Sequence, residues 1–262
     1  EKLNLPIQPL FIHGSGDVTR KHDFMTDYGR MTLQFLPAIS LKDEKFGTDY
    51  RSRTKKIGQY FKTEYKKLAE SIEQPYYFRH KIKSAFLYKG PILEWYSKVK
   101  LQLQNYYEIY DKQCPDEGKI IDLGCGYGYL SYTLMLCSDK REILGVDYDH
   151  SKVEIAQNCW LKNDRIRFEV ADLKEYQAPK ADCIILSDVL HYMSLEEQND
   201  LINRCARSLN PKGKILLRDG IIDFEDRHKK TQKTEFYSTK MFRFNKGKYD
   251  SMEFPSMQDI QS

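Results

Sequence analysis

Short apolar segments alternate with longer amphipathic stretches from about residue 119 to residue 217 of this 262-residue chain. This alternation predicts repeated strand–helix units, and therefore an α/β fold with an open, mostly parallel sheet and flanking helices. The predicted strands are Lys119–Leu123, Glu142–Asp147, Arg165–Val170, Cys183–Leu186 and Lys214–Leu217. The predicted helices between them are Tyr129–Cys137, Ser151–Leu161 and Leu195–Leu209, the last closed by the stop signal Asn210–Gly213.

The pattern weakens after Asp219. Met241–Phe244 and Lys248–Phe254 flank an Asn-Lys-Gly turn and are predicted to pair as a hairpin, and Gln258–Ile260 begin a further helix. We therefore expect the last strands of the sheet to lie beyond Ser262.

Composition indicates a globular chain, because 40% of its residues are hydrophobic and its length allows a sizeable core without cross-links. The longest uncharged run, Leu123–Ser138, is shorter than the roughly 18 apolar residues that a membrane-spanning helix needs. The six cysteines contain no Cys-x-x-Cys pair, so no metal site is predicted. Most of them fall in predicted buried segments as free thiols, which favours a reducing, cytoplasmic location.

Charge divides the chain. Residues 1–112 carry 20 basic and 13 acidic side chains, a net charge of +7, whereas residues 113–262 carry 22 and 25, a net charge of −3. In the basic part, Leu5–His13 and Met31–Leu36 are predicted strands. Helices are predicted from about Arg53 to Ile72 and from Pro75 to the break at Gly90-Pro91. One face of a third helix is predicted at Ile92, Tyr96, Val99, Leu103, Tyr106 and Tyr110.

The most informative stretch is Ile120–Gly128, a strand that runs into an Asp-x-Gly-x-Gly-x-Gly turn before a helix. Glycines here let the backbone pass close to a ligand. A dinucleotide-binding turn has its third glycine one position later, where this chain has Tyr129. The spacing therefore favours a smaller ligand without a pyrophosphate, and it disfavours a nicotinamide-dependent oxidoreductase.

Two acids follow the next predicted strands. Asp147 ends the second strand, where a carboxylate can accept hydrogen bonds from both hydroxyls of a ribose. Asp172 follows the third strand and can accept a hydrogen bond from the exocyclic amine of adenine. Since ligands bind at the carboxyl ends of strands in open α/β sheets, these acids indicate an adenosine-like ligand.

In this order and spacing, the glycine turn and the two acids resemble class I S-adenosylmethionine (SAM)-dependent methyltransferases, over about residues 76–262. In that family the glycine turn holds the methionine part of SAM, the second-strand acid holds the ribose, and the third-strand acid holds the adenine. The segment Ala181–Tyr192 is similar to the branch that acts on small molecules. The resemblance implies SAM as the cofactor, no metal, and a cofactor site at Asp122, Gly124, Cys125, Gly126, Tyr127, Gly128, Asp147, Tyr148, Asp172, Leu173 and Ser187.

Methyl transfer chiefly requires that two reactants be held in line, so no universal catalytic residue is expected. Where the acceptor is a hydroxyl or an amine, a base within hydrogen-bond reach helps. His191 is the best-placed candidate in the sequence, with Asp188 and Tyr192 beside it. Plainer alternatives remain: His191 can pack under the cofactor, Asp122 can hold the glycine turn from beneath, and Asp172 can cap a helix.

The opening Pro6-Ile7-Gln8-Pro9, with a later strand like Arg30–Ile39, resembles the last motif block of glycerolipid acyltransferases of the lysophosphatidic acid acyltransferase type. That family's substrate-binding Glu-Gly-Thr-Arg is absent, so we expect no acylation by this chain. The resemblance implies an acyltransferase-like remnant over residues 1–72. Residues 73–113 would be a basic, aromatic-rich helical cap or linker, and residues 114–262 the methyltransferase domain.

Ten of the 35 residues from Tyr76 to Tyr110 are aromatic, interleaved with lysines. Such a segment suits a peripheral membrane surface or an acyl-carrier partner, although it can also pack as a cap on the sheet. Nucleic acid is disfavoured as a partner, because the fourth strand is followed by Ser187-Asp188-Val189-Leu190 and not by the Asn/Asp-Pro-Pro-Tyr/Phe of base-amine methyltransferases.

We therefore expect methylation of a small-molecule or acylated, lipid-like acceptor. The alternative is a non-catalytic methyltransferase-like scaffold attached to an acyltransferase. Binding of SAM would distinguish the enzyme from the scaffold.

Overall fold

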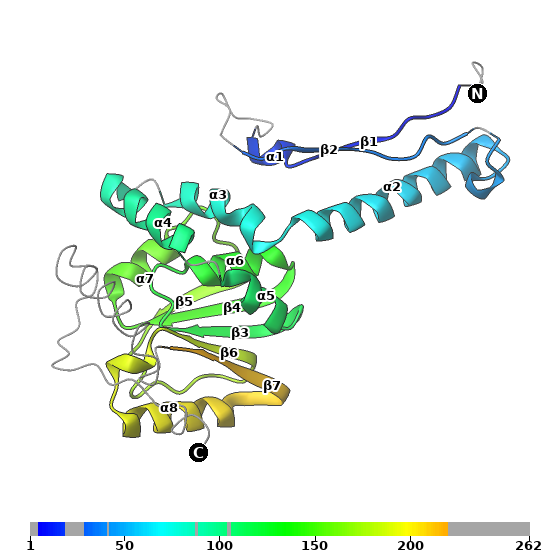
Figure 1. The fold of residues 1–262 in the computed structure, drawn as a ribbon. Coiled ribbons are helices and arrows are strands. Elements are labelled where there is room, and N and C mark those ends of the chain that lie inside the picture. The colour runs from blue at the N-terminus through cyan, green and yellow to red at the C-terminus, as the bar shows by residue number, and fades with distance from the viewer. Residues whose placement is uncertain (1–4, 19–28, 41, 87–88, 104–105, 220–262) are drawn as a thin grey trace. The chain divides into compact units, whose positions relative to one another are not determined.

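The computed structural model describes residues 5–18, 29–40, 42–86, 89–103 and 106–219 (Figure 1). The chain forms two compact units, Glu1–Ser84 and Ala85–Ser262, and each is described by itself. The hairpin predicted over residues 241–254 and the helix predicted from residue 258 lie outside the described residues. The predicted domain boundaries at residues 72 and 113 stay predictions.

The first unit pairs β1 (Leu10–His13) with β2 (Thr32–Phe35) in antiparallel fashion. The strand predicted from Leu5 is therefore shorter than expected. Between Leu5 and β1, Ile7 forms an isolated bridge with Ile39, since the flanking prolines have no N–H to donate to a ladder. The short helices of this unit are α1 (Ser15–Val18) and η1 (Glu44–Phe46).

The long helix of the first unit, α2 (Tyr50–Ile72), confirms the helix predicted over this region. It begins at Asp49, whose side chain accepts hydrogen bonds from the backbone N–H groups of Arg51 (3.0 Å) and Ser52 (3.1 Å). The next helix, α3 (Pro75–Ala85), begins at the predicted proline.

The second unit contains the predicted α/β sheet. Up to Asp219, where the described residues end, its five strands are all parallel, in the order β5-β4-β3-β6-β7. This order confirms the predicted open, parallel sheet with flanking helices, and the order in which the chain adds strands reverses between β3 and β6. The elements are β3 (Glu117–Leu123), α6 (Tyr129–Cys137), β4 (Lys140–Asp147), α7 (His150–Gln157), β5 (Ile166–Val170), β6 (Ala181–Ser187), η3 (Leu190–Tyr192), α8 (Leu195–Ser208) and β7 (Leu209–Arg218).

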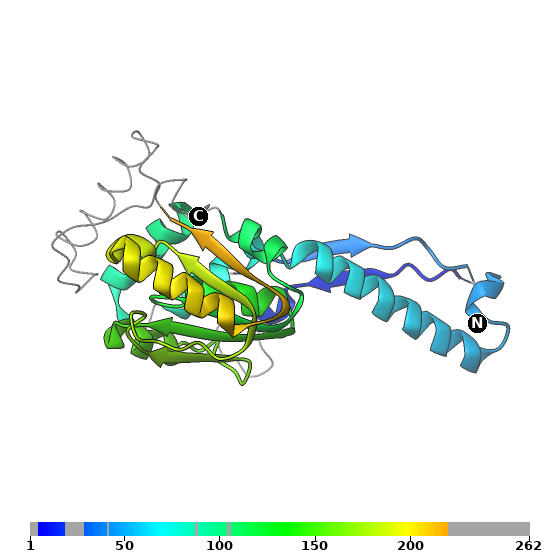
Figure 2. The same cartoon turned by 90° about the horizontal axis from the view of Figure 1, so that it is seen from below.

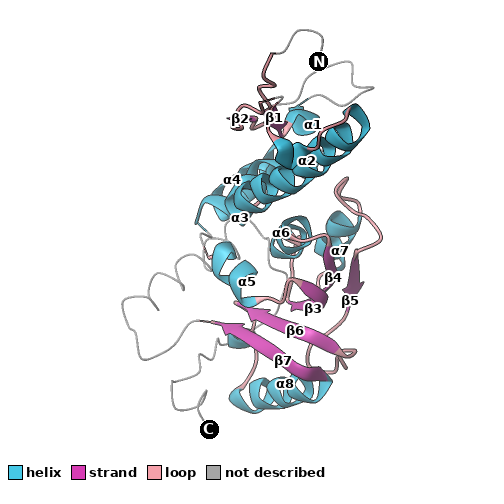
Figure 3. Cartoon of the chain, turned by 90° about the vertical axis from the view of Figure 1, so that its right-hand side faces the viewer, coloured by secondary structure: helices cyan, strands magenta, loops and turns pink. Residues whose placement is uncertain are grey.

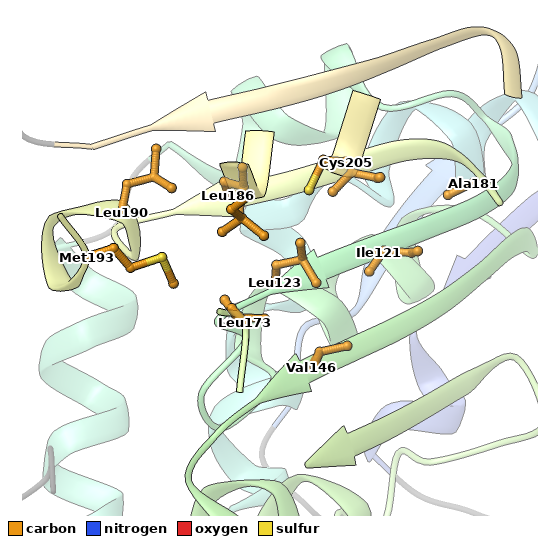
Figure 4. Close-up of a cluster of buried hydrophobic side chains, with 11 residues drawn as sticks. Ile121, Leu123, Val146, Leu173, Ala181, Leu186, Leu190, Met193 and Cys205 are labelled. Atoms are coloured by element: carbon orange, nitrogen blue, oxygen red, sulfur yellow. The ribbon is translucent and has the colours of Figure 1, made fainter. Parts of the chain in front are cut away.

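Helices cover both faces of the sheet. α6 and α7 pack on β4 and β5, whereas α8 lies along the side of β6 and β7 (Figures 2 and 3). Between α8 and the sheet lies a cluster of buried apolar side chains (Figure 4). Among its members are Ile121, Leu123, Val146, Leu186, Met193 and Cys205.

The third predicted helix is two helices, α4 (Pro91–Leu103) and α5 (Tyr107–Gln113). The predicted apolar face is also wrong at its start, because Ile92 is 68% exposed. The buried positions of α4 are Leu93, Ser97 and Leu101, one residue further round the helix. Ser97 is a polar member of this face that hydrophobic periodicity does not report, and its hydroxyl lies 2.5 Å from the Tyr129 hydroxyl.

Two boundaries in the sheet domain differ from the prediction. α7 ends at Gln157 instead of Leu161, because the Asn158 side chain donates a hydrogen bond to the Glu154 carbonyl (2.9 Å) and caps the helix. β7 begins at Leu209, so the predicted stop signal lies inside the strand. There the register shifts, and Lys212 takes a positive φ of 68°.

No helix in the described part of the chain is long and apolar enough to span a membrane. In the same residues, no group of three potential metal-binding side chains comes together. All six cysteines are free thiols in the structure.

Candidate active site

The candidate site lies where β3 and β6 end side by side, at the point where the order of strands along the chain reverses. The glycine turn leaves β3, and the segment Asp188–Val189 leaves β6. The two segments pack closely: a Cβ added to Gly124 would lie 2.8 Å from a methyl group of Val189. The strand pairing therefore brings together residues that are more than sixty positions apart in the sequence.

The three glycines of the turn all have positive φ, of 80° at Gly124, 56° at Gly126 and 77° at Gly128. A Cβ on Gly128 would lie 2.7 Å from the Phe168 ring, so that glycine is required for packing. A Cβ on Gly126 would meet nothing within 4 Å. The turn thus presents bare backbone to open space at Gly126, as a ligand cradle requires.

Asp147 connects the end of β4 to this turn. Asp147 is 5% exposed, and its carboxylate accepts hydrogen bonds from Gly126 N–H at Oδ2 (2.7 Å) and Asp149 N–H at Oδ1 (2.9 Å). A carboxylate oxygen has two lone pairs, so each oxygen keeps one acceptor position. Two remaining positions match the two hydroxyls of a ribose.

Asp122 lies beneath the turn. It is 2% exposed, and its Oδ2 accepts a hydrogen bond from the Ser131 hydroxyl of α6 (2.5 Å). Burial, opposed in part by this hydrogen bond, raises the pKa of Asp122 from 3.8 to about 6. This geometry fits the plainer alternative, in which Asp122 supports the turn, and its contact with a cofactor stays a prediction.

Aromatic side chains surround the turn on the side of α4. The ring of Tyr127 lies 5.6 Å from that of Tyr96 and 5.9 Å from that of Tyr129, with the Lys152 ammonium 6.0 Å from its centroid. Cys125 is half-buried, and burial raises the pKa of its thiol, which therefore stays protonated.

The loop after β5 contains the predicted adenine contacts. The Asp172 side chain is exposed and accepts a hydrogen bond from Lys174 N–H (2.9 Å), which is a local capping interaction. Leu173 is 4% exposed and belongs to the core under α8. Arg204 holds this loop by donating to the carbonyls of Leu173 (3.0 Å) and Lys174 (2.9 Å).

His191, the predicted base, is 1% exposed, and its Nδ1 lies 2.5 Å from Asp219 Oδ1. Asp219 Oδ2 also accepts a hydrogen bond from Leu190 N–H (2.7 Å), so this carboxylate holds the start of η3. The Tyr192 ring lies beside that of His191, with centroids 4.1 Å apart and the planes tilted by 45°. The catalytic roles of His191 and Tyr192 stay predictions.

Of the other predicted cofactor contacts, Ser187 ends β6 and is partly exposed, and Tyr148 is 40% exposed next to Asp147. Both positions are at the carboxyl edge of the sheet. Their roles also stay predictions.

A cluster at the end of β7 was not predicted. The Arg218 guanidinium lies 3.8 Å from the centroid of the Tyr106 ring and forms an ion pair with Asp188. The Tyr106 hydroxyl donates to the same Asp188 oxygen, Oδ2 (3.3 Å). No sequence signal connects residues so far apart, whereas Asp219 could have been found, because it directly follows a strand as Asp147 ends one.

The geometry can be compared with known proteins. Residues 120–213 match a family described as "Methyltransferase domain". This match identifies a methyltransferase domain over residues 120–213. The matched residues begin in β3, include the glycine turn and Asp147, and end within β7.

Known relatives of this methyltransferase domain include a phosphoethanolamine N-methyltransferase of Plasmodium falciparum, 29% identical over 115 residues, with 42% of each chain covered. A carboxy-S-adenosyl-L-methionine synthase of Shewanella loihica is 26% identical over 124 residues, covering 45% of this chain and 51% of the relative. The chain thus spans about half or less of the length of these relatives.

Among solved structures, the SAM-dependent methyltransferase SibL matches with a TM-score of 0.48 at 17% sequence identity, covering 64% of this chain and 49% of that chain. A methyltransferase of calicheamicin biosynthesis, solved with bound S-adenosylhomocysteine, matches with a TM-score of 0.44 at 14% identity, covering 64% of this chain and 48% of that chain.

The residues of the methyltransferase domain fit SAM. SAM supplies an electrophilic methyl group on a positively charged sulfur. The bare turn at Gly126 leaves room beside β3, and Asp147 keeps two acceptor positions next to it. The aspartates at the strand ends also complement a cationic ligand.

Proposed function

We propose that this chain binds SAM over the glycine turn and transfers its methyl group to a small-molecule or acylated acceptor. The observation that carries the proposal is the hydrogen bond from Gly126 N–H to Asp147, which joins the turn and the predicted ribose-binding acid in one site. In this arrangement Asp147 orients the sugar, and the turn leaves the methyl group free to face the acceptor.

The nature of the acceptor is supported by the neighbouring sequence and by the relatives. The relatives include an enzyme named for phosphoethanolamine, which is a small molecule. The acyltransferase-like motif Pro6–Pro9 supports a lipid-like or acylated acceptor and a fusion to an acyltransferase. The basic residues of 51–100 support peripheral contact with an anionic membrane surface or an acyl carrier.

Calorimetry with SAM tests the cofactor assignment. Asp147→Ala should weaken SAM binding by about 10- to 100-fold, because a hydrogen bond to a charged group contributes about 1.5–3 kcal/mol. Asp164→Ala, which removes an exposed carboxylate outside the site, should bind SAM as the unchanged protein does.

Unchanged affinity in Asp147→Ala would contradict the ribose assignment. If the unchanged protein itself does not bind SAM, the non-catalytic scaffold becomes the better description. Incubating the protein with methyl-labelled SAM and a lipid extract of its host, followed by mass spectrometry of labelled products, tests the acceptor class.

A further inference from the structure

We propose that the Asp188 carboxylate faces the methyl-transfer position and holds the hydrogen of the acceptor's reacting oxygen or nitrogen. Tyr106 and Arg218 act as positioning residues for this carboxylate. The inference rests on the proposed function, and it specifies the acceptor as one that carries a hydroxyl or an amine.

The position of Asp188 supports this role. It is the first residue after β6, and the neighbouring Val189 packs directly against Gly124 of the glycine turn. Asp188 therefore borders the glycine turn, between the ends of β3 and β6. A reacting acceptor must approach this edge if the cofactor lies over the turn.

The two oxygens of Asp188 are in different environments. Oδ2 accepts from both the Tyr106 hydroxyl (3.3 Å) and the Arg218 guanidinium. Oδ1 has no hydrogen-bond donor within reach among the described residues, and the side chain is 32% exposed. One oxygen is thus anchored while the other is available to an incoming donor.

The backbone of Asp188 is held in an uncommon conformation. Its φ of 55° is in the left-handed region, which a residue with a Cβ adopts at a cost. The conformation is held by a hydrogen bond from Asp188 N–H to the Arg218 carbonyl (2.8 Å). Such strain is concentrated at functional sites, where it sets the direction of a side chain.

Arg218 is held in turn by Tyr106. Its guanidinium lies 3.8 Å from the Tyr106 ring centroid, so the same tyrosine contacts both members of the ion pair. This arrangement limits the rotamers of Arg218 and Asp188 together, and both hydrogen bonds are made to Oδ2 and not to Oδ1 of Asp188.

The transfer step balances with this assignment for a hydroxyl acceptor. The acceptor oxygen forms a bond to the methyl carbon, the carbon–sulfur bond breaks, and its electron pair stays on the sulfur of the thioether product. The hydroxyl proton passes to Asp188 Oδ1. A neutral amine acceptor needs only the hydrogen bond, because the methylated ammonium can keep its proton.

Sinefungin, in which a protonated amine replaces the transferable methyl group, tests the position of Asp188 without an identified acceptor. We expect the full chain to bind sinefungin about 10- to 100-fold more tightly than S-adenosylhomocysteine, as a charge-assisted hydrogen bond implies. Asp188→Asn should remove most of this preference and leave the affinity for S-adenosylhomocysteine unchanged. Asp164→Asn, an exposed control, should keep the preference.

Tyr106→Phe gives a second test that leaves the charge of Asp188 in place. Removing one of the two donors to Oδ2 should reduce the sinefungin preference by about 3-fold, within the range for one hydrogen bond. An effect on overall folding alone would weaken both ligands equally and leave their ratio constant. An unchanged ratio in this folded variant would therefore overturn the positioning role.

The outcomes separate the two proposals. If S-adenosylhomocysteine binds but the preference is absent, or persists in Asp188→Asn, the role of Asp188 is wrong and the cofactor proposal stands. If neither ligand binds, the cofactor proposal itself fails. Once an acceptor is found, a ¹³C-labelled methyl group recovered on carbon would also overturn the inference.

Discussion

The Asp122 carboxyl links pH to stability, because it is buried under the glycine turn and its pKa is raised from 3.8 to about 6. Below about pH 4 the group is protonated in both the folded and the unfolded chain. Between about pH 4 and pH 6 the folded protein keeps a proton that the unfolded chain has lost. The free energy of unfolding should therefore fall as pH rises through this window, and this loss of stability should be complete above about pH 6.

Asp122→Asn should remove this loss of stability, because the amide carries no charge, while it keeps an oxygen that can accept the hydrogen bond from the Ser131 hydroxyl. We expect the variant to be more stable than the unchanged protein by about 3 kcal/mol at pH 7.5, and to show little difference at pH 4. Urea unfolding of both proteins at the two pH values measures the effect. A stability difference that does not change with pH would show that Asp122 is not the group responsible.

At the scale of elements, Arg141 of β4 links α5 to the sheet by hydrogen bonds. It is 1% exposed, and it donates to the side chain of Asp111 (2.5 Å), the Asp111 carbonyl (3.1 Å) and the Pro115 carbonyl (2.8 Å). Arg141→Met should lower the free energy of unfolding by about 3–5 kcal/mol, because it leaves Asp111 without its buried partner. Arg207→Met, at an exposed position, should change it by less than about 0.5 kcal/mol. Thermal and urea unfolding compare the variants, and a loss under 1 kcal/mol for Arg141→Met would contradict this role.

The elements differ in how far their sequences predict them. α6 has the predicted bounds, because the glycine turn must start it at Tyr129 and apolar residues fill it throughout. α4 and α5 were predicted as one helix, and the predicted face is wrong at its start, where Ile92 is exposed and Ser97, which contacts Tyr129, is buried. Periodicity reports apolar faces, whereas it cannot report a hydroxyl that is buried by a partner 32 residues away.

The same limit applies to the site. Glycine spacing and acids at strand ends identify the turn and Asp147, because both signals are local and parallel strands must bring them to one edge. The contacts of Asp188 with Tyr106 and Arg218 depend on how α5 and β7 pack, and no local pattern contains that information.

At the scale of the whole molecule, the residues described for the candidate site all belong to the second compact unit, from Tyr96 of α4 to Asp219 after β7. A protein that starts at residue 73 retains α3 complete, because that helix begins at Pro75. We therefore expect this shortened protein to bind SAM with an affinity within about 2-fold of the full chain, a difference below about 0.5 kcal/mol.

Calorimetry with SAM on both proteins gives the comparison, and the shortened protein carrying Asp147→Ala is the control for specific binding. That control should lose affinity by the same factor as the full-length Asp147→Ala variant, because the carboxylate has the same partners in both. A loss of more than about 10-fold on removing residues 1–72 would correspond to at least about 1.4 kcal/mol of binding energy from outside the second unit. The first unit would then have to be counted as part of the cofactor site.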